Sequence, residues 1–104
     1  MDEMADGELE GAVEAGGVLL VDFFAPWCGP CRALEPALLA LEKEFQGRAR
    51  LVQVNIDAAP ATAARYEIRS VPTLIFFQNG HGVETVVGTR TREQLAQKLA
   101  ALVA

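Results

Sequence analysis

The run Val18–Phe24 constrains the fold of this chain more than any other segment. Its letters, VLLVDFF, are apolar except for Asp22, and the run has the length of a strand rather than a helix. Hydrophobicity that is continuous instead of alternating is typical of a strand buried on both faces. A sheet with two buried faces needs helices on either side, so this segment predicts an α/β architecture.

The rest of the chain supplies the elements that such a sheet needs. We expect helices at 6–15, 28–46, 60–66 and from 92 onward, and further strands at 50–56, 73–78 and 83–87. Asp6 is the expected N-cap of the first helix, and Pro36 should kink the second. A capping box formed by Thr91 and Gln94 opens the last helix.

The order of these elements sets the topology of the sheet. A helix joins the first two strands, which should therefore run parallel through a right-handed crossover. The turn Asn79-Gly80 joins the last two strands into an antiparallel hairpin. We therefore expect a mixed central sheet of four strands, flanked by helices on both faces.

Size and charge exclude several classes of protein. The 104 residues fit a single domain, 1–104, and 51% of them are hydrophobic, enough for a core without a disulfide or metal staple. The net charge of −5 is concentrated in an acidic N-terminal segment and leaves no basic stripe for nucleic acid. No apolar run is long enough to span a membrane. Because the first residues also lack the features of a signal peptide, we expect a cytoplasmic location, and we expect a monomer.

The segment Trp27-Cys28-Gly29-Pro30-Cys31 carries the chemistry. It leaves the end of the first strand and enters a helix, and strand ends in α/β sheets are where functional sites form. The helix N-terminus favours a thiolate over a thiol at Cys28. We expect solvent to reach Cys28, the nucleophile, while the deeper Cys31 attacks Cys28 once a mixed disulfide has formed. Gly29 and Pro30 separate the two sulfurs, and Pro30 stiffens the turn.

Half of a metal site is the alternative interpretation of the cysteine pair. A structural zinc site needs four ligands. The chain has two cysteines and a single histidine, His81, beside the Asn79-Gly80 turn. We therefore expect no metal and no cofactor other than the redox-active pair Cys28–Cys31 itself.

Two residues outside the motif carry a further signal. Asp22 is a lone carboxylate in an apolar strand, and burial without a partner should raise its pKa. It could take or return the proton of Cys31, or it could only make a structural hydrogen bond, and the pattern does not decide between these roles. Pro72 precedes the strand at 73–78, and the base rate of about 5–6% argues against a cis Val71–Pro72 bond.

Together these motifs resemble the thioredoxin family. The sequence from Trp27 to Cys31 looks like that family's active-site signature, and the likeness covers about residues 6–104. It continues through Val21-Asp22-Phe23, Pro36, Asn55-Ile56-Asp57, Val71-Pro72-Thr73, Asn79-Gly80 and Val87-Gly88.

The resemblance implies more than the residues alone. It implies a thioredoxin fold, reduction of disulfides in partner proteins, and a thioredoxin reductase that reduces the cysteine pair again. It implies that the Val71–Pro72 bond is cis and that Asp22 is the buried acid near the second cysteine. It also implies a groove for substrate peptides, lined by Trp27, Ile56, Val71, Pro72, Val87 and Gly88.

The chain departs from the family pattern at a few positions. The short acidic segment 1–5 does not look like the family's first edge strand, so a fifth strand is present only if this segment pairs. Gln53 stands where the family usually has a lysine near the buried acid. Ser70 replaces a common glycine, and Phe24 an aromatic residue that is often tryptophan.

Two rival functions remain open at this point. One is an oxidase or disulfide isomerase on the same fold, although the Gly29-Pro30 dipeptide is of the reducing type. The other is a redox-inert module that keeps the fold only as an interaction surface. Neither the composition nor the spacing of the motifs excludes them.

Overall fold

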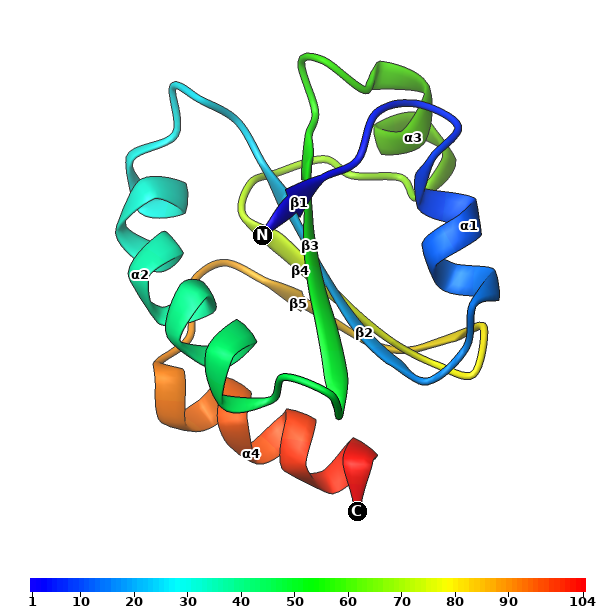
Figure 1. Ribbon diagram of the computed structural model, residues 1–104. Helices are drawn as coiled ribbons and strands as arrows, with labels where there is room; N and C mark the ends of the chain where they lie inside the picture. Colours follow the sequence, from blue (N-terminus) through cyan, green and yellow to red (C-terminus); the bar gives the residue numbers. More distant parts are fainter.

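A computed structural model describes residues 1–104 as a five-stranded mixed sheet between two layers of helices (Figure 1). The strands, in the order β1-β3-β2-β4-β5, are β1 (Asp2–Glu3), β2 (Val18–Phe24), β3 (Ala49–Asn55), β4 (Thr73–Gln78) and β5 (His81–Val87). The helices are α1 (Leu9–Glu14), α2 (Gly29–Glu44), α3 (Pro60–Arg65) and α4 (Arg92–Val103). Central β2 pairs in parallel with β3 and antiparallel with β4. The α/β architecture predicted from the sequence is confirmed.

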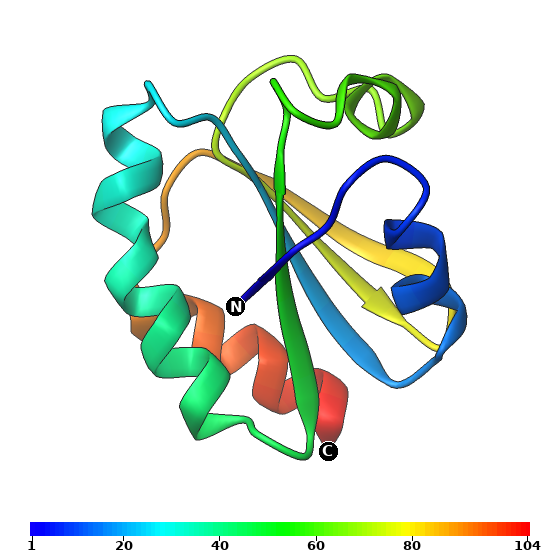
Figure 2. The ribbon, with the colours of Figure 1, turned by 45° about the horizontal axis from the view of Figure 1, so that its top comes forward.

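Alternate side chains of β2 build two apolar cores, one on each face of the sheet. Val18 and Leu20 pack with residues of α2 and α4, whereas Leu19, Val21 and Phe23 pack with residues of α1 and with the two cap residues of α3, Ala59 and Tyr66. Figures 1 and 2 show these two pairs of helices on opposite sides of the sheet. Burial of both faces is the reason that β2 is continuously apolar.

The first edge strand is present, although the sequence of residues 1–5 gave no strand signal. Asp2 and Glu3 pair in parallel with two residues of β3, and the Asp2 carboxylate accepts a hydrogen bond from Arg50 at 3.0 Å. A strand of two residues is too short to show an alternating pattern. The sheet therefore has five strands rather than four.

The prediction that Asp6 caps the first helix is wrong. α1 begins only at Leu9, and the Asp6 carboxylate instead lies at the start of α3. It accepts hydrogen bonds from the N–H of Ala61 at 3.3 Å and from the N–H and hydroxyl of Thr62, both at 2.8 Å. These bonds, above all the one from the Thr62 backbone, lower the pKa of Asp6. Asp6 precedes Ala61 by 55 residues, so this capping contact leaves no local pattern in the sequence.

The other predicted helices are present, and the kink expected at Pro36 stays a prediction. α2 runs through Pro36 to Glu44, and the capping box at the start of α4 is complete. The Thr91 hydroxyl accepts from the N–H of Gln94 at 3.1 Å, and the Gln94 side chain accepts from the N–H of Thr91 at 2.9 Å. No helix in the chain is both long and apolar enough to cross a lipid bilayer.

Candidate active site

β2 leads directly to the cysteine pair at the N-terminus of α2. Cys28 has an extended backbone (φ −86°, ψ 110°) and is the N-cap residue, while Cys31 lies in the first turn. Gly29 and Pro30 begin the helix, where the missing N–H of proline is not needed. The two cysteines form a disulfide with their Cα atoms 5.3 Å apart.

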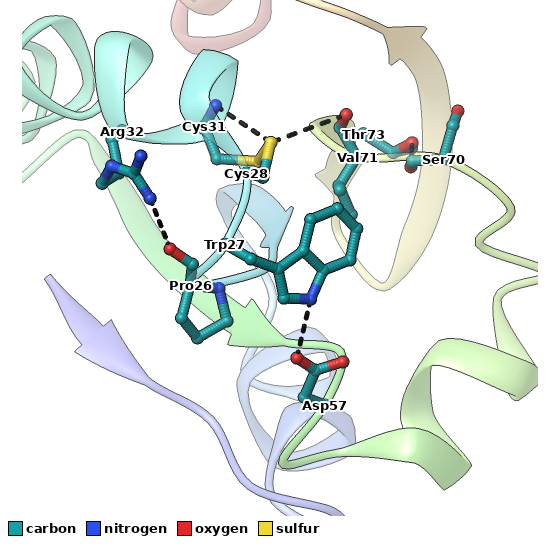
Figure 3. Close-up of a disulfide and its surroundings, with 9 residues drawn as sticks. All are labelled: Pro26, Trp27, Cys28, Cys31, Arg32, Asp57, Ser70, Val71 and Thr73. Atoms are coloured by element: carbon teal, nitrogen blue, oxygen red, sulfur yellow. Dashed lines mark hydrogen bonds between the residues drawn. A yellow bond between two sulfur atoms is a disulfide. The ribbon is translucent and has the colours of Figure 1, made fainter.

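The sulfur of Cys28 itself caps α2. It accepts a hydrogen bond from the backbone N–H of Cys31 at 3.1 Å (Figure 3). This N–H and the positive end of the helix dipole both stabilise negative charge on Cys28 once the disulfide is reduced. The same sulfur lies 3.8 Å from the carbonyl oxygen of Val71. A disulfide sulfur carries no hydrogen, so this contact becomes a hydrogen bond only in the thiol form.

Burial does not distinguish the two cysteines in the disulfide form. Cys28 is 5% exposed and Cys31 is 4% exposed, so the prediction that solvent reaches Cys28 but not Cys31 is wrong for this state. The reason is an apolar cover: the pair packs with Ala25, and Ile56 and Val71 lie against this cluster. Cys28 differs from Cys31 in two other ways: its sulfur accepts a hydrogen bond from the backbone, and it is the N-cap residue of α2.

Trp27 is the most exposed large apolar side chain beside the cysteines. Its indole is 67% exposed, and its Nε1 donates a hydrogen bond to a carboxylate oxygen of Asp57 at 3.0 Å (Figure 3). Asp57 follows β3 and is itself held by the Asn55 side chain, which accepts from the N–H of Asp57 at 2.9 Å. Asp57 had no predicted role, because a contact between two loops leaves no local signal in the sequence.

The expected groove residues lie at the same end of the sheet as the cysteines. The Val71–Pro72 bond is cis, as the resemblance implied and against the base rate. The carbonyl of Pro72 accepts from the N–H of Gly88 at 2.9 Å, and the adjoining Val87 is 57% exposed. On the other side of the cysteines, the N–H of Ile56 donates to the backbone of β2 at 2.9 Å. Of the six expected groove residues, Ile56 and Val71 thus pack against the cysteine pair.

Ser70, one of the departures from the family pattern, helps to order the loop before Pro72. Its carbonyl oxygen accepts a hydrogen bond from the hydroxyl of Thr73 at 2.6 Å. Because a backbone carbonyl makes this bond, it does not depend on the side chain at position 70.

Asp22 lies on the α2 side of the sheet and is 4% exposed. Its Oδ1 atom has no hydrogen-bond partner. Burial, and to a lesser degree the negative charge of Glu35, raises the pKa of Asp22 from 3.8 to about 7. The raised pKa predicted from the sequence is therefore confirmed. The neutral Gln53 is its direct neighbour on β3.

Glu35, whose negative charge acts on Asp22, had no predicted role. Glu35 follows Cys31 by four residues on α2, so the two share one side of the helix. That spacing was a usable signal once the helix was expected at 28–46.

A surface hollow of about 620 Å³ lies at the other end of the sheet. It is lined by residues of the β2 start, the α2 end and the β3 start, and none of its 11 lining residues is a candidate site residue. The chain has no group of three or more histidine, cysteine or acidic side chains arranged to hold a metal ion.

Comparisons with known proteins agree with this geometry. The family model described as thioredoxin matches residues 2–101. Thioredoxins of Staphylococcus aureus strains Mu50 and MW2 are 43% identical to the chain over 97 residues, which cover 93% of this chain and 92% of each relative. The solved structure of a mutant thioredoxin from Halobacterium salinarum NRC-1 superimposes with a TM-score of 0.88 at 34% identity, covering 99% of this chain and 92% of that one. The chain therefore belongs to the thioredoxin family and is a thiol–disulfide oxidoreductase that reduces protein disulfides.

Proposed function

We propose that Cys28 is the nucleophile and Cys31 the resolving thiol in a dithiol exchange with disulfides of partner proteins. The observation that carries this assignment is the hydrogen bond from the Cys31 N–H to the Cys28 sulfur at the start of α2. A thiolate at Cys28 keeps that bond and lies at the positive end of the helix dipole. Gly29 and Pro30 hold the two sulfurs within pairing distance.

The cycle has two exchanges. The Cys28 thiolate attacks one sulfur of the partner's disulfide, and the other partner sulfur leaves as a thiolate. Asp22 then accepts the proton of Cys31, and the Cys31 thiolate attacks the sulfur of Cys28. The bond between Cys28 and the partner breaks, and the partner's second thiolate leaves. Two electrons have then passed to the partner, and the Cys28–Cys31 disulfide remains.

The surface around the cysteines supports a protein substrate. The exposed Trp27 and Val87 provide apolar contact area next to Ile56, Val71, Pro72 and Gly88. Aromatic and apolar side chains on an open surface are typical of contacts between proteins. A polypeptide lying along these six residues would bring its disulfide to Cys28.

We propose further that the protein takes part in cellular electron transport. A thioredoxin reductase would supply the electrons that reduce the Cys28–Cys31 pair after each cycle. The protein would act in the cytoplasm as a monomeric single domain, residues 1–104, and maintain cell redox homeostasis. Its only redox group is the cysteine pair, so the cycle needs no metal or bound cofactor.

A trapping experiment tests the roles of the two cysteines. Cys31→Ser should accumulate mixed disulfides with a protein substrate such as insulin, since nothing resolves the bond to Cys28. Cys28→Ser should form no such adducts and should not accelerate insulin reduction by dithiothreitol. Adducts formed equally by both variants would contradict the assignment of Cys28 as the nucleophile.

A redox titration separates a reductase from an oxidase or isomerase. Equilibration of the wild-type protein with dithiothreitol and glutathione buffers gives the potential of the cysteine pair. A potential well below that of the glutathione pool supports reduction of partners, whereas a potential above it would favour the rival function.

A further inference from the structure

The buried Asp22 shares the α2 side of the sheet with a second acidic residue, Glu3. In the parallel register, Asp22 pairs with Gln53 and Gln53 pairs with Glu3, so these three side chains form a row across β2, β3 and β1. Side chains at paired positions point to the same face of a sheet. On β4 the neighbour of Asp22 is the apolar Leu74. The sheet therefore offers Asp22 a neutral amide, an aliphatic side chain and, further out, a second carboxylate.

Glu35 lies on α2, and its negative charge acts on Asp22. It is exposed and lies one turn after the buried Cys31, beside the buried stripe formed by Leu34, Leu38 and Leu41. Glu42, seven residues further along the same side of α2, forms an ion pair with the amine of Met1 at 3.3 Å. That contact shows that this side of α2 faces β1 and β3, where the row containing Asp22 lies.

No ion pair balances these carboxylates. Arg32 on α2 donates to the carbonyl of Pro26 at 2.6 Å, and Arg50 on β3 pairs with Asp2 at 3.0 Å. The basic residues of α4 that form ion pairs are likewise engaged: Arg92 pairs with Glu44, and Lys98 with Glu84. Asp22, Glu3 and Glu35 form no ion pair, and Asp22 Oδ1 has no hydrogen-bond partner.

We propose that Glu35 is a positioning residue that acts through Asp22, as the solvent-facing member of a carboxylate pair that sets the pH at which Cys31 resolves the mixed disulfide. The proposal rests on the proposed role of Asp22 as the acceptor of the Cys31 proton. The charge of Glu35 opposes ionisation of Asp22, so Asp22 keeps its own proton to higher pH than burial alone would require. Only ionised Asp22 can accept the Cys31 proton as the Cys31–Cys28 bond forms and the partner thiolate leaves.

The same carboxylate pair acts in the opposite direction when the disulfide is reduced again. Cys31 then leaves as a thiolate, and protonated Asp22 returns a proton to it. Because Glu35 increases the protonated fraction of Asp22 near neutral pH, it slows resolution and assists reduction of the pair. Glu35 thus shifts to higher pH both the onset of resolution and the upper limit of the range in which Asp22 can return a proton to Cys31.

The test compares three single variants with the wild-type protein. Glu35→Gln removes the charge from an exposed helix position without changing helix propensity or shape. Glu44→Gln makes the same chemical change at the exposed end of α2, in an ion pair with Arg92 whose two side chains are 41% and 51% exposed, and is the matched control. Asp22→Asn tests whether Asp22 takes part in resolution of the mixed disulfide. Two quantities are measured: the NMR titration of the Asp22 carboxyl carbon in the oxidised protein, and the rate of mixed-disulfide resolution between about pH 5 and pH 9 by double-mixing stopped flow.

Glu35→Gln should lower the midpoint of the Asp22 titration and move the pH profile of resolution in the same direction. Resolution should become faster on the acidic side, by about twofold at about pH 6, without a higher plateau. Glu44→Gln should reproduce the wild-type titration and profile. Unchanged Asp22 titration in Glu35→Gln, or an equal shift in Glu44→Gln, would overturn the proposal.

Asp22→Asn separates this proposal from the proposed function. If Asp22→Asn leaves the resolution profile unchanged, Asp22 does not take the Cys31 proton and both ideas fail together. If Asp22→Asn slows resolution while Glu35→Gln shifts neither measurement, the function stands and only the role of Glu35 is rejected.

Discussion

Replacement of Asp22 by asparagine should stabilise the oxidised protein, and the gain should be larger at alkaline than at acidic pH. Burial, and then the charge of Glu35, raises the pKa of Asp22 from 3.8 to about 7 in the folded state. The native state therefore holds this proton more tightly than the unfolded chain does. The protonated Asp22 therefore contributes stability to the folded state. This contribution is complete below the pKa of the unfolded chain, 3.8, and is lost as the pH rises through the folded-state pKa of about 7.

The structure sets the size of the effect. At about 1.4 kcal/mol for each pH unit between the two pKa values, ionisation of Asp22 removes about 4 kcal/mol of stability by about pH 8. About 2.5 kcal/mol of this loss falls between about pH 5 and pH 8. Asp22→Asn cannot ionise, so it escapes the loss, whereas every other group titrates alike in the two proteins.

Urea unfolding monitored by far-UV circular dichroism measures this difference directly. Both proteins are unfolded with the disulfide intact at about pH 5 and about pH 8, and the free energies of unfolding are compared at each pH. The advantage of Asp22→Asn should be about 2.5 kcal/mol larger at the higher pH. An advantage that is the same at both pH values would refute the argument that Asp22 is protonated in the native protein near neutrality.

Three further substitutions test other contacts. Thr91→Ala removes the cap of α4 and should lower the free energy of unfolding by about 1 kcal/mol in urea titrations, whereas Thr89→Ala should not. Leu99→Ala empties a fully buried position between α4 and the sheet and should lower it by about 3 kcal/mol. Asp57→Ala removes the acceptor for the Trp27 indole and should lower kcat/KM for insulin reduction about threefold, with the redox potential unchanged. An unaltered kcat/KM would mean that Trp27 needs no fixed orientation.

Features with a local pattern could be predicted from the sequence. The bounds of β2 match the apolar run Val18–Phe24 because the residues that follow Gly17 are buried on both faces. The position of Cys28 and Cys31 at a helix start follows from the change from strand to helix periodicity at that point. The raised pKa of Asp22 follows from one acid in an apolar strand.

Features that depend on distant partners could not be predicted in this way. β1 exists because Asp2 and Glu3 pair with β3, about 50 residues away, and not because their side chains favour a strand. Asp6 looked like a helix cap and is one, but for α3 rather than for its own neighbour. The burial of Cys28 arises from Ile56 and Val71, which only the tertiary fold brings to it.

The place of Trp27 gives the protein a built-in optical reporter. It is the only tryptophan in the chain, and its indole stands on the surface beside the disulfide rather than in either core. Selective excitation of this residue therefore reads out events at the cysteines, with no background emission from the interior. Quenching by the neighbouring disulfide, or shielding by a docked polypeptide, would alter the signal without any label. For the same reason, tryptophan emission would be a poor gauge of unfolding, which is better followed through the backbone.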